Sequence, residues 1–391
     1  MIEGKSKVVK TGVLRQGLVG GGTGSFIGDV HRKAAAFDGK AQMVAGCFSR
    51  DWEVTQATGQ MLGLNEDRIY KTYAEMAQAE GAREDGIDFV SICTPNYAHY
   101  DIAKAFMEQN IHIICDKPLA LTLEQGEELT KIAKERYLLF CVTYAYSAHP
   151  VLYHAREMVR NGELGDIRVV VGEYPQCWLA DKLEDTGQRQ AAWRTDPKMA
   201  GISNCVGDIG SHIEHTVSFV TGLKIKSLCA NLTAFGENRE LDTNAEILVR
   251  LENGGTGSYW CSQVAIGNDN GLKIRIYGTK GAIEWEQETP NVIKICMANG
   301  PVQIFSRGNG YLYPEAAELS RIPSGHPEGY YIGFANVYNA FLSALIKKQA
   351  GESLTAKDLD FPDVLDGVQG IKFIHACVDS SKNGAVWVDI K

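Results

Sequence analysis

Residues 15–28 read Arg15-Gln16-Gly17-Leu18-Val19-Gly20-Gly21-Gly22-Thr23-Gly24-Ser25-Phe26-Ile27-Gly28, and this stretch decides the fold. It starts as a short apolar strand, passes through a glycine cluster and leads into a helix-like segment at 29–37. Glycines in such a loop let the backbone approach a pyrophosphate, whose charge meets the N-terminus of the following helix. The spacing is irregular, because Gly20-x-Gly22 lacks a third glycine at the usual offset and the alternative spacing from Gly22 ends at Gly28. A purely structural turn is the alternative, but a position between strand and helix favours a dinucleotide site.

The segments after this loop alternate between strand and helix. Strands are predicted at 42–48, 89–93, 111–115 and 138–143, and helices at 53–62, 97–109 and 123–136. Thr122 and Gln125 form a capping box at the start of the last helix. This alternation predicts an α/β fold with a doubly wound parallel sheet of the Rossmann type.

The pattern changes near His149. A helix at 151–161 is followed by strand-like runs at 167–174, 225–231, 245–251, 257–263, 272–277, 282–287 and 292–296, and the chain ends in helices at 330–347 and 364–378. Short turns such as Asn253-Gly254 and Asn270-Gly271 predict a mostly antiparallel sheet. We therefore expect two domains, at 1–148 and 149–391.

Composition limits the class of protein. The 391 residues are 45% hydrophobic and 22% charged, and the net charge of −9 disfavours nucleic acid and anionic membranes as partners. Met1–Lys10 lacks the features of a targeting segment, and no run reaches 18 apolar residues, so a cytoplasmic protein is expected. The ten cysteines include no C-x-x-C pair and most lie in apolar runs, which indicates reduced core thiols and no metal site.

The end of the second strand bears on the choice of cofactor. NAD sites usually carry an acidic residue there, which binds the ribose hydroxyls. Here the strand ends in Ser49-Arg50, a hydroxyl and a guanidinium that suit a 2′-phosphate. NADP is favoured over NAD, although Asp51 follows and Arg50 could be a solvated surface charge.

Two polar clusters could carry chemistry. Lys117, in Cys115-Asp116-Lys117-Pro118, follows a strand at the edge where open α/β sheets bind ligands. Asp208 and His212 are four residues apart, so on a helix they share a face and the carboxylate can orient the imidazole. A helix-start carboxylate beside a core histidine is the alternative. His212 and His215 could ligate zinc, but no further ligand follows at a suitable spacing, and no metal is proposed.

Taken together, these landmarks resemble the Gfo/Idh/MocA oxidoreductases, which include glucose-fructose oxidoreductase and inositol dehydrogenase. The matching segments are the glycine loop ending Gly28-Asp29-Val30-His31, Thr94-Pro95-Asn96-Tyr97-Ala98-His99, Cys115-Asp116-Lys117-Pro118, Gly162-Glu163-Leu164-Gly165, Trp193-Arg194-Thr195-Asp196-Pro197 and Gly207-Asp208-Ile209-Gly210-Ser211-His212. The resemblance implies an NAD(P)-binding Rossmann domain, an α/β domain with an open sheet for substrate and subunit contacts, and a homodimer or homotetramer. It also implies hydride transfer between the cofactor and a secondary alcohol of a sugar, sugar derivative, glycoside or cyclitol.

The resemblance also implies roles for individual residues. Lys117, Asp208 and His212 correspond to the catalytic group. The expected cofactor-binding residues are Gly20, Gly22, Thr23, Gly24, Phe26, Ile27, Ser49, Arg50, Thr94, Pro95, Asn96, His99, Asp116 and Lys117. Because polyol rings are held by hydrogen bonds at their edges and aromatic surface on their faces, the expected substrate-binding residues are Lys117, Tyr146, Gln176, Trp178, Arg194, Asp208, His212, His215 and His326, with Tyr174 as a further candidate.

This chain departs from the family pattern in three places. Asp116 replaces the usual glutamate before the lysine and is one methylene shorter. The glycine loop is longer than usual. His215 stands where inositol dehydrogenases tend to have an aspartate, which bears on the hydroxyl that is recognised.

For the chemistry, we expect His212 to act as general base, oriented by Asp208, while Lys117 donates a hydrogen bond to the developing alkoxide. The reverse assignment, with Lys117 as base, stays open. A glycosidase or lyase that oxidises a sugar transiently would use the same residues. A non-catalytic cofactor-binding sensor is disfavoured, because lysine, aspartate and histidine are all present.

Overall fold

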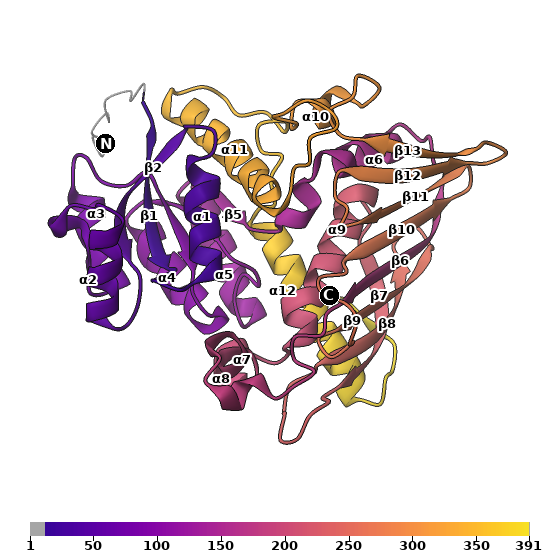
Figure 1. Cartoon of the computed structure of the whole chain (residues 1–391), viewed down its shortest axis with the longest axis horizontal. Helices are drawn as coiled ribbons and strands as arrows, with labels where there is room; N and C mark the ends of the chain where they lie inside the picture. The colour runs from indigo at the N-terminus through magenta and orange to yellow at the C-terminus, as the bar shows by residue number, and fades with distance from the viewer. Residues whose placement is uncertain (1–11, 391) are drawn as a thin grey trace.

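The computed structural model describes residues 12–390, which form two β-sheets with helices packed between them (Figure 1). The expectation about Met1–Lys10 lies outside this range. Among the described residues, no helix is long and apolar enough to cross a membrane.

The first sheet has five parallel strands in the order β2-β1-β3-β4-β5. Its strands are β1 (Leu14–Gly20), β2 (Ala41–Cys47), β3 (Phe89–Cys93), β4 (His112–Cys115) and β5 (Phe140–Val142). The helices that alternate with them are α1 (Phe26–Ala36), α2 (Trp52–Met61), α3 (Tyr73–Ala82), α4 (His99–Glu108) and α5 (Leu123–Glu135). Strand order reverses beside β1, so the carboxyl ends of β1 and β3 border the crevice where such sheets bind ligands.

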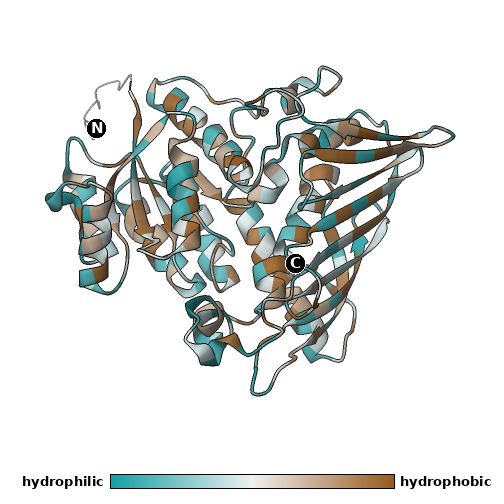
Figure 2. Cartoon of the chain, in the orientation of Figure 1, coloured by the Kyte–Doolittle hydropathy of each residue, from teal (hydrophilic) through white to brown (hydrophobic). Residues whose placement is uncertain are grey.

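Both faces of this sheet are covered, which confirms the doubly wound prediction. On one face α1 packs in a core cluster with α11 (Tyr330–Gln349), and on the other α4 and α5 pack together with α12 (Val364–Lys382). Figure 2 shows hydrophobic residues along the strands and hydrophilic residues on the outward side of α1. Apolar residues on both faces are what a parallel sheet buried between helices requires.

The second sheet has nine strands in the order β13-β12-β11-β10-β6-β9-β8-β7-β14. They are β6 (Ile167–Pro175), β7 (Ile225–Thr233), β8 (Asn244–Leu251), β9 (Thr256–Ser262), β10 (Lys273–Gly278), β11 (Gly281–Glu286), β12 (Val292–Met297), β13 (Val302–Ser306) and β14 (Val388–Asp389). Neighbouring strands are antiparallel except for β6 and β9, which confirms a mostly antiparallel sheet.

Helices cover the inner face of the second sheet. The α-helices of the described chain not yet named are α6 (Pro150–Arg160), α7 (Arg189–Arg194), α8 (Pro197–Ala200), α9 (Ser211–Thr221) and α10 (Pro314–Ala317). In Figure 1, α9, α11 and α12 lie between the two sheets. The helix α12 contributes Phe373 and Cys377 to the core of the second sheet and Val368 to that of the first. The two sheets are therefore joined through shared helices as well as through the chain.

The strands β13 and β14 and the short helices α7, α8 and α10 were not predicted, nor was α3. The helix α3 was missed because it has few large apolar residues and buries only Met76, Ala77 and Glu80. Its signal was the capping box formed by Thr72 and Glu75. The division at 148/149 stays a prediction, and α11 shares a core with the first sheet although it belongs to the second half of the chain.

Candidate active site

The centre of the site is an ion pair between the two halves of the chain. Lys117 follows β4 of the parallel sheet, and its Nζ lies 2.9 Å from Asp208 Oδ1. The ammonium also donates to the backbone carbonyl of Asp208. Both side chains are mostly buried, so solvent screens this pair less than it would a surface pair.

Asp208 collects further donors. Its Oδ2 accepts from Arg194 Nε at 3.1 Å and from Gln263 Nε2 at 3.0 Å. Burial by itself raises the pKa of Asp208, but the nearby Arg194 and Lys117 cations outweigh burial and hold that pKa well below its usual range. Asp208 is therefore a carboxylate near neutral pH.

The predicted pairing of Asp208 with His212 is not among the hydrogen bonds of residues 12–390. Residues Val206–Gly210 form a π-helical turn before α9, and its wider i→i+5 pattern displaces the i,i+4 neighbours of an α-helix. The carboxylate binds Lys117 and Arg194 instead. Asp208 therefore influences His212 through electrostatic interaction and not through a hydrogen bond.

The His212 ring is surrounded by three tyrosine rings. Its ring centroid lies 4.7 Å from that of Tyr146, 5.7 Å from Tyr144 and 6.2 Å from Tyr174. The residue keeps 8% of its surface exposed, and its ring donates to and accepts from no other described residue. Burial, together with the Lys117 charge, lowers the pKa of His212 well below its ordinary value. The imidazole is therefore neutral near pH 7 and can accept a proton.

Asn270, which was not among the predicted site residues, joins three that were: Tyr146, Tyr174 and Gln176. Asn270 Oδ1 accepts from Tyr174 OH at 2.7 Å and from Gln176 Nε2 at 2.8 Å, and Asn270 Nδ2 lies 3.2 Å from Tyr146 OH. The Tyr174 and Tyr146 hydroxyl oxygens also lie 2.8 Å apart. This network fixes a polar and aromatic wall beside His212. The only sequence signal for Asn270 was its turn with Gly271.

Other predicted substrate residues divide into two groups. The guanidinium of Arg194 lies 4.2 Å from the Trp193 ring centroid and 5.8 Å from that of Trp178, which places Trp178 next to the Asp208 cluster. His215 is buried, and its ring stacks on that of Tyr144 with the centroids 4.2 Å apart. His326 is exposed in the loop before α11, where its Nδ1 faces the Pro323 carbonyl, and no described contact brings it to Lys117 or His212.

The glycine loop has the form of a phosphate cradle. Gly20, Gly21 and Gly24 have positive φ angles, and Ser25 caps α1 by accepting from the Gly28 amide. Within the described range, the amides of Gly24, Phe26 and Ile27 donate to no protein group. These donors at the N-terminus of an 11-residue helix fit a pyrophosphate.

Gly28 has a role that the predicted cofactor residues omitted. A Cβ at Gly28 would lie 2.3 Å from the Gly21 Cα, so only glycine lets α1 pack this close to the end of β1. This is the function of the third glycine in dinucleotide-binding loops, reached here through a longer spacing. The alternative spacing from Gly22, ending at Gly28, contained this signal.

Ser49 and Arg50, the residues predicted to bind the adenosine ribose, follow β2. Arg50 is exposed after β2 and forms no hydrogen bond or ion pair with the rest of the described chain. Ser49 Oγ accepts from the Asp51 amide at 3.1 Å, and Asp51 Oδ1 caps α2. The first carboxylate after β2 is therefore partly engaged by a helix end, while the Arg50 guanidinium is available.

In the turn after β3, the side chains of Asn96 and His99 are bonded to protein carbonyls. Asn96 donates from Nδ2 to the Ala200 carbonyl at 3.0 Å, which links the turn to α8. His99 is buried, with its ring nitrogens 2.8 Å from the Pro118 carbonyl and 2.9 Å from the Thr94 carbonyl. His99 therefore ties the turn to the lysine loop and is not presented to a ligand. Thr94 and Pro95 are partly exposed beside it.

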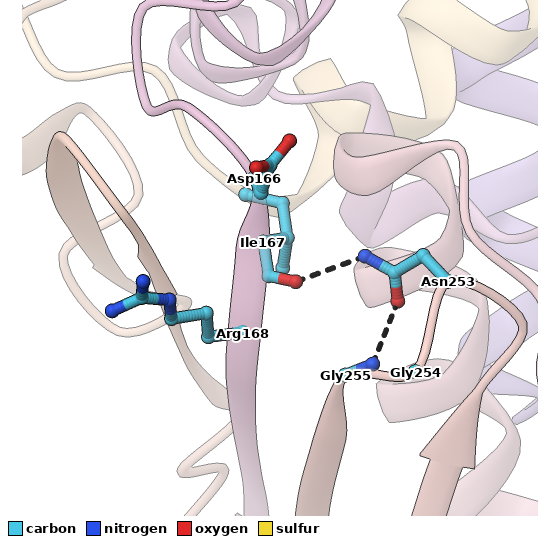
Figure 3. Close-up of a pocket in the computed structure, with 6 residues that line it drawn as sticks. All are labelled: Asp166, Ile167, Arg168, Asn253, Gly254 and Gly255. Carbon is cyan, nitrogen blue, oxygen red and sulfur yellow. Dashed lines mark hydrogen bonds between the residues drawn. The ribbon is translucent and has the colours of Figure 1, made fainter.

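A surface hollow of about 360 Å³ lies elsewhere (Figure 3). It is lined by Asp166, Ile167, Arg168, Asn253, Gly254 and Gly255. Asn253 is engaged there, with Nδ2 donating to Ile167 O and Oδ1 accepting from the Gly255 amide, each at 2.9 Å. Since β6 rises about 3.3 Å per residue over nine residues, the hollow lies on the order of 25 Å from Gln176 at the opposite end of the strand. It is separate from the Lys117 site.

Comparison with known families agrees with this architecture. Residues 14–144 match the model of an oxidoreductase family with an NAD-binding Rossmann fold, and residues 152–284 match the GFO/IDH/MocA C-terminal domain. Fold and family match thus define an oxidoreductase built from a Rossmann unit and a C-terminal α/β unit with a mixed sheet. The chain belongs to the Gfo/Idh/MocA family.

Similar proteins give the comparison more detail. The oxidoreductase YfiI of Bacillus subtilis is 36% identical over the full length of both chains. An inositol dehydrogenase homologue from Azotobacter vinelandii, solved with NADH and myo-inositol, is 36% identical with a TM-score of 0.92 over 97% of this chain and 98% of that one. Levoglucosan dehydrogenase of Pseudarthrobacter phenanthrenivorans is 27% identical over 78% of this chain and 80% of its own length.

Proposed function

We propose that this protein is an NAD(P)-dependent dehydrogenase that oxidises a secondary alcohol of an uncharged sugar, glycoside or cyclitol, or reduces the matching ketone. The observation that carries the proposal is the Lys117–Asp208 ion pair beside a neutral, accessible His212, next to a glycine cradle. The cradle follows β1 and Lys117 follows β4, with only β3 between them in the sheet. At about 4.8 Å per strand, one extended dinucleotide can reach both places.

The cofactor would be held by this chain's own groups. The amides of Gly24, Phe26 and Ile27 would bind the pyrophosphate, Ser49 and Arg50 would face the adenosine ribose, and the turn at Thr94 and Pro95 would lie along the nicotinamide half. When bound, a nicotinamide cofactor accepts or gives the hydride. The Arg50 guanidinium favours tolerance of a 2′-phosphate, while NADH in a solved relative supports NAD use.

The protein's part in the chemistry is proton handling. His212 takes the hydroxyl proton, because its imidazole is neutral and open on one side. Lys117 donates a hydrogen bond to the oxygen where negative charge develops. Asp208 is not assigned as the base, because both of its oxygens are engaged by Lys117, Arg194 and Gln263; it holds the Lys117 ammonium in place. The exchanged assignment, with Lys117 as base, is tested by the same variants.

The charges of the site favour an uncharged substrate. The two cations at its centre, Lys117 and Arg194, both contact Asp208, so a phosphate or carboxylate would compete with an existing pair. The wall of Tyr146, Tyr174 and Gln176 instead offers hydroxyl and amide groups with an aromatic surface, which suits a polyol ring. We also propose a cytoplasmic location, since all ten cysteines are free thiols.

The test combines binding with turnover. NAD and NADP are screened by thermal shift, and nicotinamide absorbance is then followed with inositols, hexoses, glucosides, levoglucosan and glucose 6-phosphate. We expect stoichiometric cofactor reduction with at least one uncharged alcohol, abolished in Lys117→Ala. Product formation without net cofactor reduction would instead identify a glycosidase or lyase that oxidises transiently. Failure of both cofactors to bind would contradict the proposal.

A further inference from the structure

A buried contact joins the helix of the glycine loop to the turn that carries Lys117. His31 lies on α1, and its Nε2 is 2.9 Å from Oδ1 of Asp116, the residue before Lys117. The same oxygen accepts from Thr143 Oγ1 at 2.5 Å. The His31 side chain is completely buried, whereas 16% of the Asp116 side chain is exposed.

The contact is supported from behind by a chain of hydroxyl groups. His31 Nδ1 lies 2.6 Å from Tyr338 OH on α11, and that hydroxyl lies 2.7 Å from Ser91 Oγ on β3. Ser91 Oγ in turn accepts from Gln16 Nε2 on β1 at 2.8 Å. Each ring nitrogen of His31 therefore has one partner, and these two contacts fix the orientation of the imidazole.

The two oxygens of Asp116 are in different surroundings. Oδ1 has two partners in the interior, whereas Oδ2 accepts from none of residues 12–390 and belongs to the exposed part of the side chain. A carboxylate held through one oxygen presents the other in a fixed direction. Burial raises the pKa of Asp116, but His31 and Thr143 outweigh that effect and keep the group ionised.

We propose that His31 is a positioning residue that acts through Asp116: it ties the Lys117 turn to the helix that receives the cofactor pyrophosphate, and aims Asp116 Oδ2 at the nicotinamide end of the site. The role rests on the proposed function. It explains how a carboxylate one methylene shorter than glutamate is kept in place, since the imidazole reaches from α1 to meet it.

Two substitutions at position 31 separate the contacts of the imidazole. The amide of asparagine sits near the position of Nδ1, so His31→Asn keeps a group for Tyr338 and loses the bond to Asp116. The amide of glutamine reaches the position of Nε2, so His31→Gln keeps the donor to Asp116 and loses the Tyr338 contact. Tyr338→Phe is the matched control, because it removes only the hydroxyl behind the ring.

Binding is measured by fluorescence with two ligands, NADH and ADP-ribose, of which the second lacks nicotinamide. For His31→Asn we expect NADH to bind about tenfold more weakly, the loss typical of one hydrogen bond to a charged group, while the Kd of ADP-ribose stays within about twofold. His31→Gln and Tyr338→Phe should stay within about threefold for both ligands. In turnover, kcat should fall about tenfold in His31→Asn only.

Other patterns overturn the proposal. Equal losses in His31→Asn and His31→Gln, or equal weakening of NADH and ADP-ribose, would mean that His31 only stabilises α1. If His31→Asn does not fold, Thr143→Val removes the other donor to the same oxygen, and it must weaken NADH without weakening ADP-ribose. If the wild-type protein oxidises no alcohol, the proposed function fails, and the binding comparison still decides the role of His31.

Discussion

Lys117 Nζ and Asp208 Oδ1 lie 2.9 Å apart and form an ion pair between the loop after β4 and the turn before α9. The pair brings residues 91 positions apart in sequence to the same point between the two sheets. It places an ammonium and a carboxylate beside the aromatic wall that surrounds His212. The predictions below concern this site and its borders.

Removing either proposed proton-handling residue should abolish turnover without removing the cofactor. We expect Lys117→Ala and His212→Ala each to lower kcat by roughly 10²–10⁴-fold, the range for general acid–base and oxyanion groups. The Kd of NADH, measured by fluorescence, should change by less than about threefold. Unchanged turnover in either variant would exclude that residue from the chemistry, and Lys198→Ala, on α8 outside the pair, is the control.

Arg50 should decide how well a 2′-phosphate is accepted. Because its guanidinium is exposed and unengaged after β2, Arg50→Ala should lower kcat/KM for NADP by about tenfold and leave that for NAD within about twofold. Steady-state kinetics with both cofactors measures the ratio. A loss confined to NAD would contradict this assignment of Arg50.

Asn270 should act on substrate affinity. Asn270→Ala leaves the hydroxyls of Tyr146 and Tyr174 and the amide of Gln176 without their shared partner. We expect KM for the alcohol to rise about tenfold, with a smaller change in kcat and none in the Kd of NADH. Asn268→Ala, in the same turn, removes only a bond to Ala265 and should behave like the wild type.

The stability of the protein should depend on pH through His215. Burial lowers the pKa of His215 to about 3. Between pH 6.5 and 3, His215 is therefore protonated in the unfolded chain and neutral in the folded chain. The contribution is absent above pH 6.5, and acidification below it destabilises the fold by up to about 1.4 kcal/mol per pH unit. Glu214 has the opposite sign, because burial raises its pKa to about 7.

The variant His215→Phe isolates this effect, since a phenyl ring can keep the stacking on Tyr144. Denaturant unfolding at pH 7 and pH 5 should show a smaller loss of stability on acidification in the variant than in the wild type. The Glu214 contribution is common to both proteins. Identical losses would show that His215 does not titrate in this way.

The outer face of the nine-stranded sheet should carry the contact between subunits. Leu248 on β8 is 52% exposed and Val169 on β6 is 39% exposed, although both lie on strands of the sheet. We expect a dimer or tetramer by light scattering, and a shift toward monomer in Leu248→Asp. Met61→Asp, at an exposed apolar residue on α2, should leave the oligomeric state unchanged.

The sequence predicted elements better than it predicted side-chain partners. Hydrophobic period and turn residues located all five strands of the first sheet and seven of the nine of the second, and motif order located Lys117, Asp208 and His212. The π-helical turn at Asp208 left no periodic signal, so its partners Arg194 and Gln263 were not foreseen as a group. Contacts such as Asn270 with Tyr146 join residues more than a hundred positions apart, and only the folded chain determines them.

The parallel pairing of β6 with β9 has a practical consequence for engineering. Both strands end at the same edge of the sheet, where the backbone N–H of Gln176 donates to the Ser262 carbonyl at 2.7 Å. The loops that leave this edge can be lengthened or exchanged while the strand register, set by the residues before them, is retained. Loop grafting at this edge therefore offers a way to alter the neighbouring site, while the opposite ends of the same strands maintain the scaffold.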